Sequence, residues 1–231
     1  MKVNKIGFLA SADAAKPAII IERLSRYKLL RGYEMVLFTV GNCGKCYTVC
    51  QKFGIKIVQL ENEKLNEQGD LELIKFEHCD LLISMGWPNL VPKAVLDIFA
   101  KSINCHGSIL PDYRGSRSYM HYYSNLEPNY GASIHYMNEK FDDGKVLIQA
   151  GYQTLPNENN DDMHIRTAEL CAFLLPTAIH LVENDDEGYE PSGEKRYFYK
   201  RTPEEFEEYR KRNEQLKKEG KPLVLTPHKV L

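Results

Sequence analysis

The sequence predicts an α/β protein built on a doubly wound, mostly parallel, Rossmann-like sheet. Short apolar runs alternate with helical patterns from the first residues onward. This βαβα order is typical of successive parallel strands in one sheet, joined by helices that cover its two faces. The run Asp80–Met85 (DLLISM) is continuously apolar, which is typical of a strand buried on both faces.

The first half of the chain supplies most of this sheet. Pro17 suits the first turn of a helix, and Gly54 can end the short helix that precedes it. Strands are expected at Lys5–Leu9, Glu34–Val40, Ile55–Gln59, Asp80–Met85 and Ser102–His106. Helices are expected at Pro17–Tyr27, Cys46–Phe53, Leu71–Glu77 and Pro92–Phe99.

The second half continues with a pair of strands and an extension. Gly131–Met137 and Val146–Tyr152 are expected as strands around the turn Phe141–Gly144, where Asp and Gly favour tight geometry. A helix is expected at Asp162–Val182, a short strand at Arg196–Lys200, and a charged helix from Pro203 to about Gly220 behind the Thr202/Glu205 capping box. We therefore expect one domain over residues 1–182 and an extension over 183–231, a short hairpin or strand plus the charged helix.

Composition narrows the classes of function. The chain has 231 residues, 43% of them hydrophobic, and a formal net charge of −2 at pH 7. This balance gives no electrostatic reason to expect nucleic acid. We expect no signal peptide and no membrane span, since no apolar run approaches the roughly 20 residues a span needs. The protein is expected in the cytoplasm, with its six cysteines as free thiols, small buried residues or ligands rather than disulfides.

The stretch "NCHGSILPDYRG" carries the strongest functional pattern. Asn104, His106 and Ser108 alternate, so an extended chain would place them on one face. In doubly wound sheets, ligands bind beyond the carboxyl ends of the strands. His106 ends one expected strand, and the loop Met85–Leu90 follows another. The sequence therefore predicts one cleft shared by these two strand ends.

A second pattern supplies a carboxylate. Asp142 lies in the expected turn Phe141–Gly144, where turn geometry alone would explain it. If the turn returns to the strand end, Asp142 would fix the tautomer of His106 and favour its imidazolium.

Together these motifs resemble the folate-dependent formyltransferases. The family pattern is Asn-x-His-x-Ser-x-Leu-Pro followed at a distance by Asp-x-Gly, and it matches from Asn104 to Pro111 and at Asp142 and Gly144. The segment Gly86–Leu96 (GWPNLVPKAVL) resembles the family's folate-binding loop and the helix after it. The likeness extends over roughly Ile6–Gln149.

The resemblance implies transfer of a formyl group from 10-formyltetrahydrofolate to an amine, with no metal. Asn104 and His106 would donate hydrogen bonds to the formyl oxygen, and one such donor is typically worth about 3–4 kcal/mol of barrier. Asp142 would accept the proton of the attacking amine, directly or through water, and hold His106. Such a group contributes roughly 10²–10⁴-fold.

The same resemblance indicates binding residues. The cofactor-binding residues would be Met85, Gly86, Trp87, Leu90, Met137 and Phe141, around the pterin. The substrate-binding residues would be Ser108, Arg114 and Lys16, the last two as contacts to a diphosphate.

The acceptor implied is the amine of a nucleotide-linked amino sugar, such as a dTDP- or UDP-4-amino sugar. The pairing of "HGSILPDYRG" with the late "YFYKRTPEE" resembles that branch, many of whose members are dimers, although the glycine that usually follows is replaced by Phe206. Glycinamide ribonucleotide or another small amine is the alternative acceptor. The glycine-rich phosphate loop expected of glycinamide ribonucleotide transformylase is, however, missing from Ser11–Pro17. The residues after Gln149 are expected to be too few and too acidic for the separate basic domain of methionyl-tRNA enzymes.

A competing hypothesis from a different class rests on cysteine spacing. Cys43-Gly-Lys-Cys46, with Cys50 one turn later, suggests a redox or zinc-binding module. No second Cys-x-x-Cys supplies the remaining ligands. A binding-only protein that keeps the fold without the chemistry is a further alternative.

Overall fold

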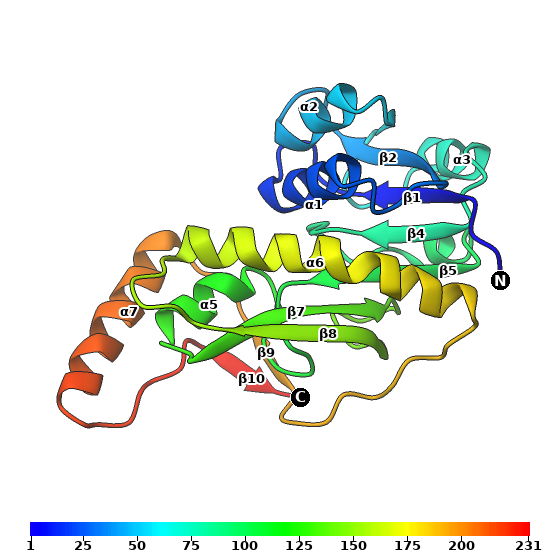
Figure 1. The fold of residues 1–231 in the computed structure, drawn as a ribbon. Coiled ribbons are helices and arrows are strands. Elements are labelled where there is room, and N and C mark those ends of the chain that lie inside the picture. Colours follow the sequence, from blue (N-terminus) through cyan, green and yellow to red (C-terminus); the bar gives the residue numbers. More distant parts are fainter.

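The computed structural model describes residues 1–231 and contains a seven-stranded sheet in the order β3-β2-β1-β4-β5-β7-β8 (Figure 1). Its first five strands are parallel, and β7 and β8 are antiparallel additions at one edge. The strands are β1 Lys5–Leu9, β2 Glu34–Val40, β3 Lys56–Leu60, β4 Leu81–Ser84, β5 Lys101–His106, β7 Asn129–Tyr136 and β8 Val146–Gln153. The predicted fold class is confirmed.

Helices cover both faces of this sheet because alternate strand residues point to opposite sides. In β4, Leu81 and Ile83 join one buried cluster and Leu82 joins the other. The helices on the first face are α1 Ala15–Arg26, α2 Lys45–Lys52 and α6 Asn160–Glu183, and those on the second are α3 Gln68–Phe76 and α4 Lys93–Leu96.

Helix α6 is longer and more apolar than expected, since the sequence analysis found no apolar run that approaches the length of a membrane span. It runs along the sheet beside α1 (Figure 1), and it is long and apolar enough, by length and composition only, to cross a membrane. Its most apolar window is 56% buried inside the fold. That is the pattern of a core helix, so the apolar length reflects packing against α1 and the sheet.

The chain after α6 wraps back to the other end of the molecule (Figure 1). There β9 Arg196–Phe198 pairs with β10 His228–Val230 on one side and with β6 Arg114–Gly115 on the other. Helix α7 Pro203–Lys218 begins at the predicted Thr202/Glu205 capping box and lies against α5 Ser118–Ser124. The expected hairpin is therefore a strand pair with α7 inserted between its strands.

Three short elements were missed by the sequence analysis, namely β6, α5 and β10. Each is too short to show a period. Gly115 marks one of them, since its φ is +99° and an added Cβ would lie 2.5 Å from the Phe198 carbonyl oxygen. Only glycine allows β6 and β9 to approach this closely.

Candidate active site

A row of polar side chains crosses the sheet near the carboxyl end of its parallel strands. The strand register places Ser84 of β4 beside Asn104 of β5, and Asn104 beside His135 of β7. All three line a cleft of about 720 Å³, a size that suits a small-molecule ligand. The loop after β4 and the end of β5 both line it, which confirms the predicted shared cleft.

The turn between β7 and β8 brings Asp142 into this row. Asp142 has φ +48°, a left-handed conformation that aspartate tolerates better than most residues. Its Oδ2 accepts a hydrogen bond from the Gly115 backbone N–H at 2.9 Å. Its Oδ1 lies 3.3 Å from Nδ1 of His106. The structure thus brings Asp142 to the strand end that holds His106.

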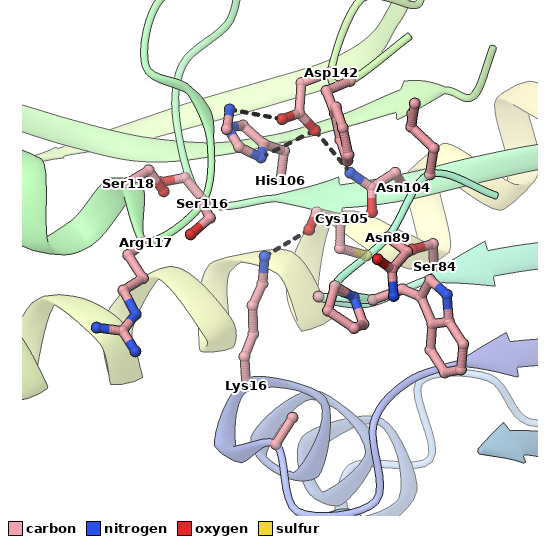
Figure 2. Close-up of a pocket in the computed structure, with 18 of the residues that line it drawn as sticks. Lys16, Ser84, Asn89, Asn104, Cys105, His106, Ser116, Arg117, Ser118 and Asp142 are labelled. Carbon is pink, nitrogen blue, oxygen red and sulfur yellow. Dashed lines mark hydrogen bonds and ion pairs between the residues drawn. The ribbon is translucent and has the colours of Figure 1, made fainter. Parts of the chain in front are cut away.

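Asn104 turns its amide nitrogen inward. Its Nδ2 lies 3.2 Å from Oδ1 of Asp142 and 3.1 Å from Nε2 of His135, and Figure 2 shows the amide oxygen turned away from Asp142. The reverse amide orientation would set two oxygens against each other. The expected donation from Asn104 to a formyl oxygen is therefore not made in this conformation, because both N–H groups already have acceptors.

His135 is a site residue that the sequence analysis missed. It is buried, and its Nδ1 lies 2.7 Å from the Tyr136 carbonyl oxygen. Since a carbonyl only accepts, Nδ1 carries the proton, and Nε2 is left to accept from Asn104. A signal was available: His135 stands directly opposite Asn104 in the antiparallel pair, at a strand position where an apolar residue is usual.

His106 has an acceptor at each ring nitrogen. Nε2 lies 2.9 Å from the Tyr113 carbonyl oxygen, and Nδ1 faces Asp142. Burial lowers the pKa of His106, while Asp142 and the Tyr113 carbonyl act in the opposite direction. Burial outweighs the two acceptors, so the ring is held neutral, while a proton gained during transfer would still have an acceptor at each nitrogen.

Asp142 itself stays ionised. Burial alone would raise the pKa of its carboxyl, but the imidazole of His106 and the Gly115 N–H act against burial, and that pKa is lowered. A carboxylate that accepts several N–H bonds is stabilised in its charged form. The site therefore combines a fixed carboxylate with two imidazoles and an amide.

Five of the six residues expected around a pterin line the cleft. They are Gly86, Trp87, Leu90, Met137 and Phe141. Trp87 also donates from Nε1 to the Glu63 carbonyl oxygen at 3.0 Å. Met85 is a wrong prediction. It continues the alternation of β4, so its side chain joins Leu81 and Ile83 in the core and is fully buried.

One of the three expected substrate-binding residues lies at the cleft and two do not. Lys16 lines the cleft, but Ser108 and Arg114 do not. Ser108 is fully buried and donates to the Asp112 carbonyl oxygen at 2.9 Å, since the strand ends at His106 and the chain turns away. Arg114 is buried with its guanidinium paired to Asp143, so it cannot reach a ligand in the cleft.

Basic side chains gather in the cleft from separate parts of the chain. Lys16 rises from the first turn of α1, and its Nζ lies 2.5 Å from the Cys105 carbonyl oxygen (Figure 2). Arg117, Lys140 and Lys200 also line the cleft. Lys200 and the nearby Tyr197 come from the C-terminal motif YFYKRTPEE, which indicated the acceptor branch, although neither residue was assigned to the site. This lining is suited to an anionic ligand.

The cysteine motif gives no metal site. Cys43 is exposed, whereas Cys46 and Cys50 are buried in the core. No group of three or more possible ligands is found in the structure. The hydrogen bond with Cys50, together with burial, raises the pKa of the Cys46 thiol, which opposes thiolate chemistry there. The structure thus gives no support to the zinc or redox alternative.

Comparison with known proteins finds similarity to formyltransferases. The family model described as formyl transferase matches residues 32–179. The chain is 30% identical over 132 residues to a methionyl-tRNA formyltransferase of Methylacidiphilum infernorum, covering 57% of this chain and 41% of that protein. It is 31% identical over 125 residues to a GDP-perosamine N-formyltransferase of Brucella melitensis, covering 54% and 48%. The chain thus spans less than half the length of each of these relatives.

Solved structures share the fold. Glycinamide ribonucleotide transformylase 1 from Symbiobacterium toebii superposes with a TM-score of 0.68 at 19% identity, over 79% of this chain and 89% of that one.

Proposed function

The chain belongs to the formyl transferase family, and on that premise we propose that it moves a formyl group from 10-formyltetrahydrofolate to the amine of a nucleotide-linked amino sugar. The observation that carries this proposal is the convergence of Asn104, His106 and Asp142 inside one cleft. Residues 1–182 would form the catalytic domain. The extension over 183–231 would complete the cleft with Tyr197 and Lys200.

The proposed reaction needs a carbonyl polarised and a proton moved. The acceptor nitrogen attacks the formyl carbon, a new C–N bond forms, and negative charge develops on the formyl oxygen. The bond to N10 of the folate then breaks, and the proton lost by the acceptor amine ends on N10, which gives the formamide and tetrahydrofolate. Asp142 and His106 would carry that proton.

Substrate binding would give new partners to two side chains. Catalytic hydrogen bonds in ligand-free enzymes are often formed only in the complex. His106 can give up the Tyr113 carbonyl for the formyl oxygen, and Asn104 can present its amide oxygen to the N–H of the acceptor. One donor on a developing oxyanion lowers the barrier by about 3–4 kcal/mol.

The folate would lie between the loop after β4 and the β7–β8 turn. Trp87 and Leu90 supply apolar surface on one side, and Met137 and Phe141 supply it on the other. Aromatic and apolar walls suit the flat pterin ring.

The acceptor would take the basic part of the cleft. Lys16, Arg117 and Lys200 line the cleft, and their charge supports a phosphate-bearing acceptor over a neutral amine. The name of the Brucella relative, a GDP-perosamine N-formyltransferase, supports a nucleotide-linked sugar. The proposed location is the cytoplasm, with which six unpaired cysteines agree.

The experiment is a panel of acceptors supplied with 10-formyltetrahydrofolate, with release of tetrahydrofolate as the readout. dTDP-, UDP- and GDP-linked 4-amino sugars are expected to be formylated, with glycinamide ribonucleotide and simple amines as comparison. Formylation of glycinamide ribonucleotide alone would overturn the sugar assignment and keep the transferase. No release with any acceptor, while folate still binds, would favour a binding-only protein.

A further inference from the structure

Two consecutive residues of β6 hold two consecutive carboxylates of the β7–β8 turn. The guanidinium of Arg114 pairs with the carboxylate of Asp143. The backbone N–H of Gly115 donates to the carboxylate of Asp142 at 2.9 Å. The turn that carries Asp142 is therefore fastened to β6 at two adjacent points, although it lies 27 residues further along the chain.

The Arg114 contact is built into the interior. Arg114 is only 3% exposed, and its Nε donates to the Pro111 carbonyl oxygen at 3.2 Å. A buried guanidinium without a carboxylate would be strongly destabilising, so the pair with Asp143 has to persist in the folded protein. Strand β6 itself is held by its parallel pairing with β9, in which Arg114 lies opposite Tyr197.

The other contacts of Asp143 are weaker. Its second cationic neighbour is Lys140, whose side chain is 78% exposed and whose Nζ lies 3.8 Å away. Exposed pairs of this kind contribute little. Asp142 next to it is held at φ +48°, a conformation that persists only where the surroundings enforce it. Arg114 is the buried group that provides this restraint.

We infer that Arg114 is a positioning residue for the Asp142 carboxylate, acting through Asp143 on the turn that places Asp142 beside His106. This inference rests on the proposed function, since the geometry that it protects is the 3.3 Å approach of Asp142 to His106. A displacement of about 1 Å in such a contact typically costs about 10²-fold in rate. This positioning role replaces the diphosphate contact that the sequence suggested for Arg114.

The kinetic test separates placement from binding. Arg114→Met is expected to lower kcat roughly 10²-fold while leaving KM for both substrates nearly unchanged. Arg114→Lys keeps a cation but loses the planar guanidinium with its several N–H donors, so it should recover part of kcat. If Arg114→Met does not fold, the double variant Arg114→Met/Asp143→Asn serves in its place, since it leaves neither charge unpaired, and it should lower kcat in the same direction.

The matched control is Arg166→Met. Arg166 donates to the buried carboxylate of Glu158 at 2.6 Å, so the variant breaks a comparable ion pair, and neither partner lines the cleft. It should lose stability but keep kcat. Equal loss of kcat in the Arg114 and Arg166 variants would reduce Arg114 to a structural residue and overturn the inference.

A second readout does not depend on activity. The imidazole of His106, followed by NMR in histidine-labelled protein, titrates under the influence of Asp142, His135 and Lys16. Moving the carboxylate away removes an interaction that favours the imidazolium, so the pKa of His106 should fall in Arg114→Met and stay unchanged in Arg166→Met. An unchanged His106 titration in a folded Arg114→Met overturns the inference. A lower His106 pKa in Arg114→Met, found together with a wild-type protein that transfers no formyl group, would keep the inference and reject the proposed function.

Discussion

The amide nitrogen of Asn104 lies 3.2 Å from the carboxylate of Asp142, although 38 positions separate the two residues in the chain. The contact couples charge to orientation. While Asp142 is ionised, the amide keeps its nitrogen toward the carboxylate and its oxygen away from it. The carboxylate therefore orders both of its polar neighbours on β5, Asn104 by this bond and His106 by the approach of Nδ1 at 3.3 Å.

Replacing Asp142 by Asn tests this role of the charge. Asparagine tolerates the left-handed conformation at this position, so the fold should remain. Formyl transfer should fall by roughly 10²–10⁴-fold, because the proton acceptor is lost and the amide of Asn104 no longer has a carboxylate to face. Tetrahydrofolate release measures the rate, and folate affinity should be nearly unchanged. Turnover near the wild-type level would remove Asp142 from the catalytic set.

Much of this site could be predicted because its chemistry is carried by residue identity. Asn104, His106 and Asp142 are polar residues at strand ends and in a turn, where packing does not require them. Period and apolar runs located β1 and β2 with the bounds found in the structure. These are local features of the chain, which a sequence displays directly.

What the sequence could not predict depends on long-range contacts. Arg114 follows a proline turn near the site and carries a charge, so it was assigned to a ligand, yet its partner Asp143 lies 29 positions away. Met85 was assigned to the cleft because of the loop after it, whereas strand alternation turns it into the core. Lys200 reaches the cleft through the pairing of β6 with β9, and strands this short have no period to detect.

The single tryptophan of the chain offers a direct probe of folate binding. Trp87 is 8% exposed, lines the cleft and is held by its bond to the Glu63 carbonyl. Saturation with a folate should change its fluorescence, and Trp87→Phe should abolish the signal and weaken binding roughly tenfold by equilibrium dialysis. Binding by dialysis with no change in Trp87 emission would place the folate elsewhere.

Lys200 should contribute to acceptor affinity. Lys200→Met should raise KM for a nucleoside-diphosphate-linked amine about 2–5-fold, which is what one exposed ion pair contributes. KM for the folate should stay unchanged, and added salt should reduce the difference between the variant and the wild type. Lys211→Met on α7 is the matched control, since it removes the same charge from a residue that does not line the cleft. An equal rise in KM for both variants would indicate a general effect of net charge.

His121 should make the free energy of unfolding fall as the pH is lowered into the acid range. Its ring is fully buried against Phe198 and Phe206, and its Nδ1 lies 2.7 Å from the Thr226 hydroxyl. Burial lowers the pKa of His121 from 6.5 to about 3. The unfolded chain therefore binds this proton first, so the stability contributed is complete above pH 6.5 and is lost as the pH falls toward 3.

The corresponding variant is His121→Gln, which keeps a polar side chain of similar size but does not titrate. It should lose some stability at every pH, because the packing against Phe198 and Phe206 is altered. Between pH 7 and pH 5, however, the wild type should lose about 2 kcal/mol more than the variant, measured as the free energy of unfolding in urea. His164, whose pKa burial lowers to about 4, contributes equally to both proteins and cancels in the difference. Parallel stability curves would show that His121 takes up its proton without disturbing the contacts of β9, α7 and the C-terminal segment.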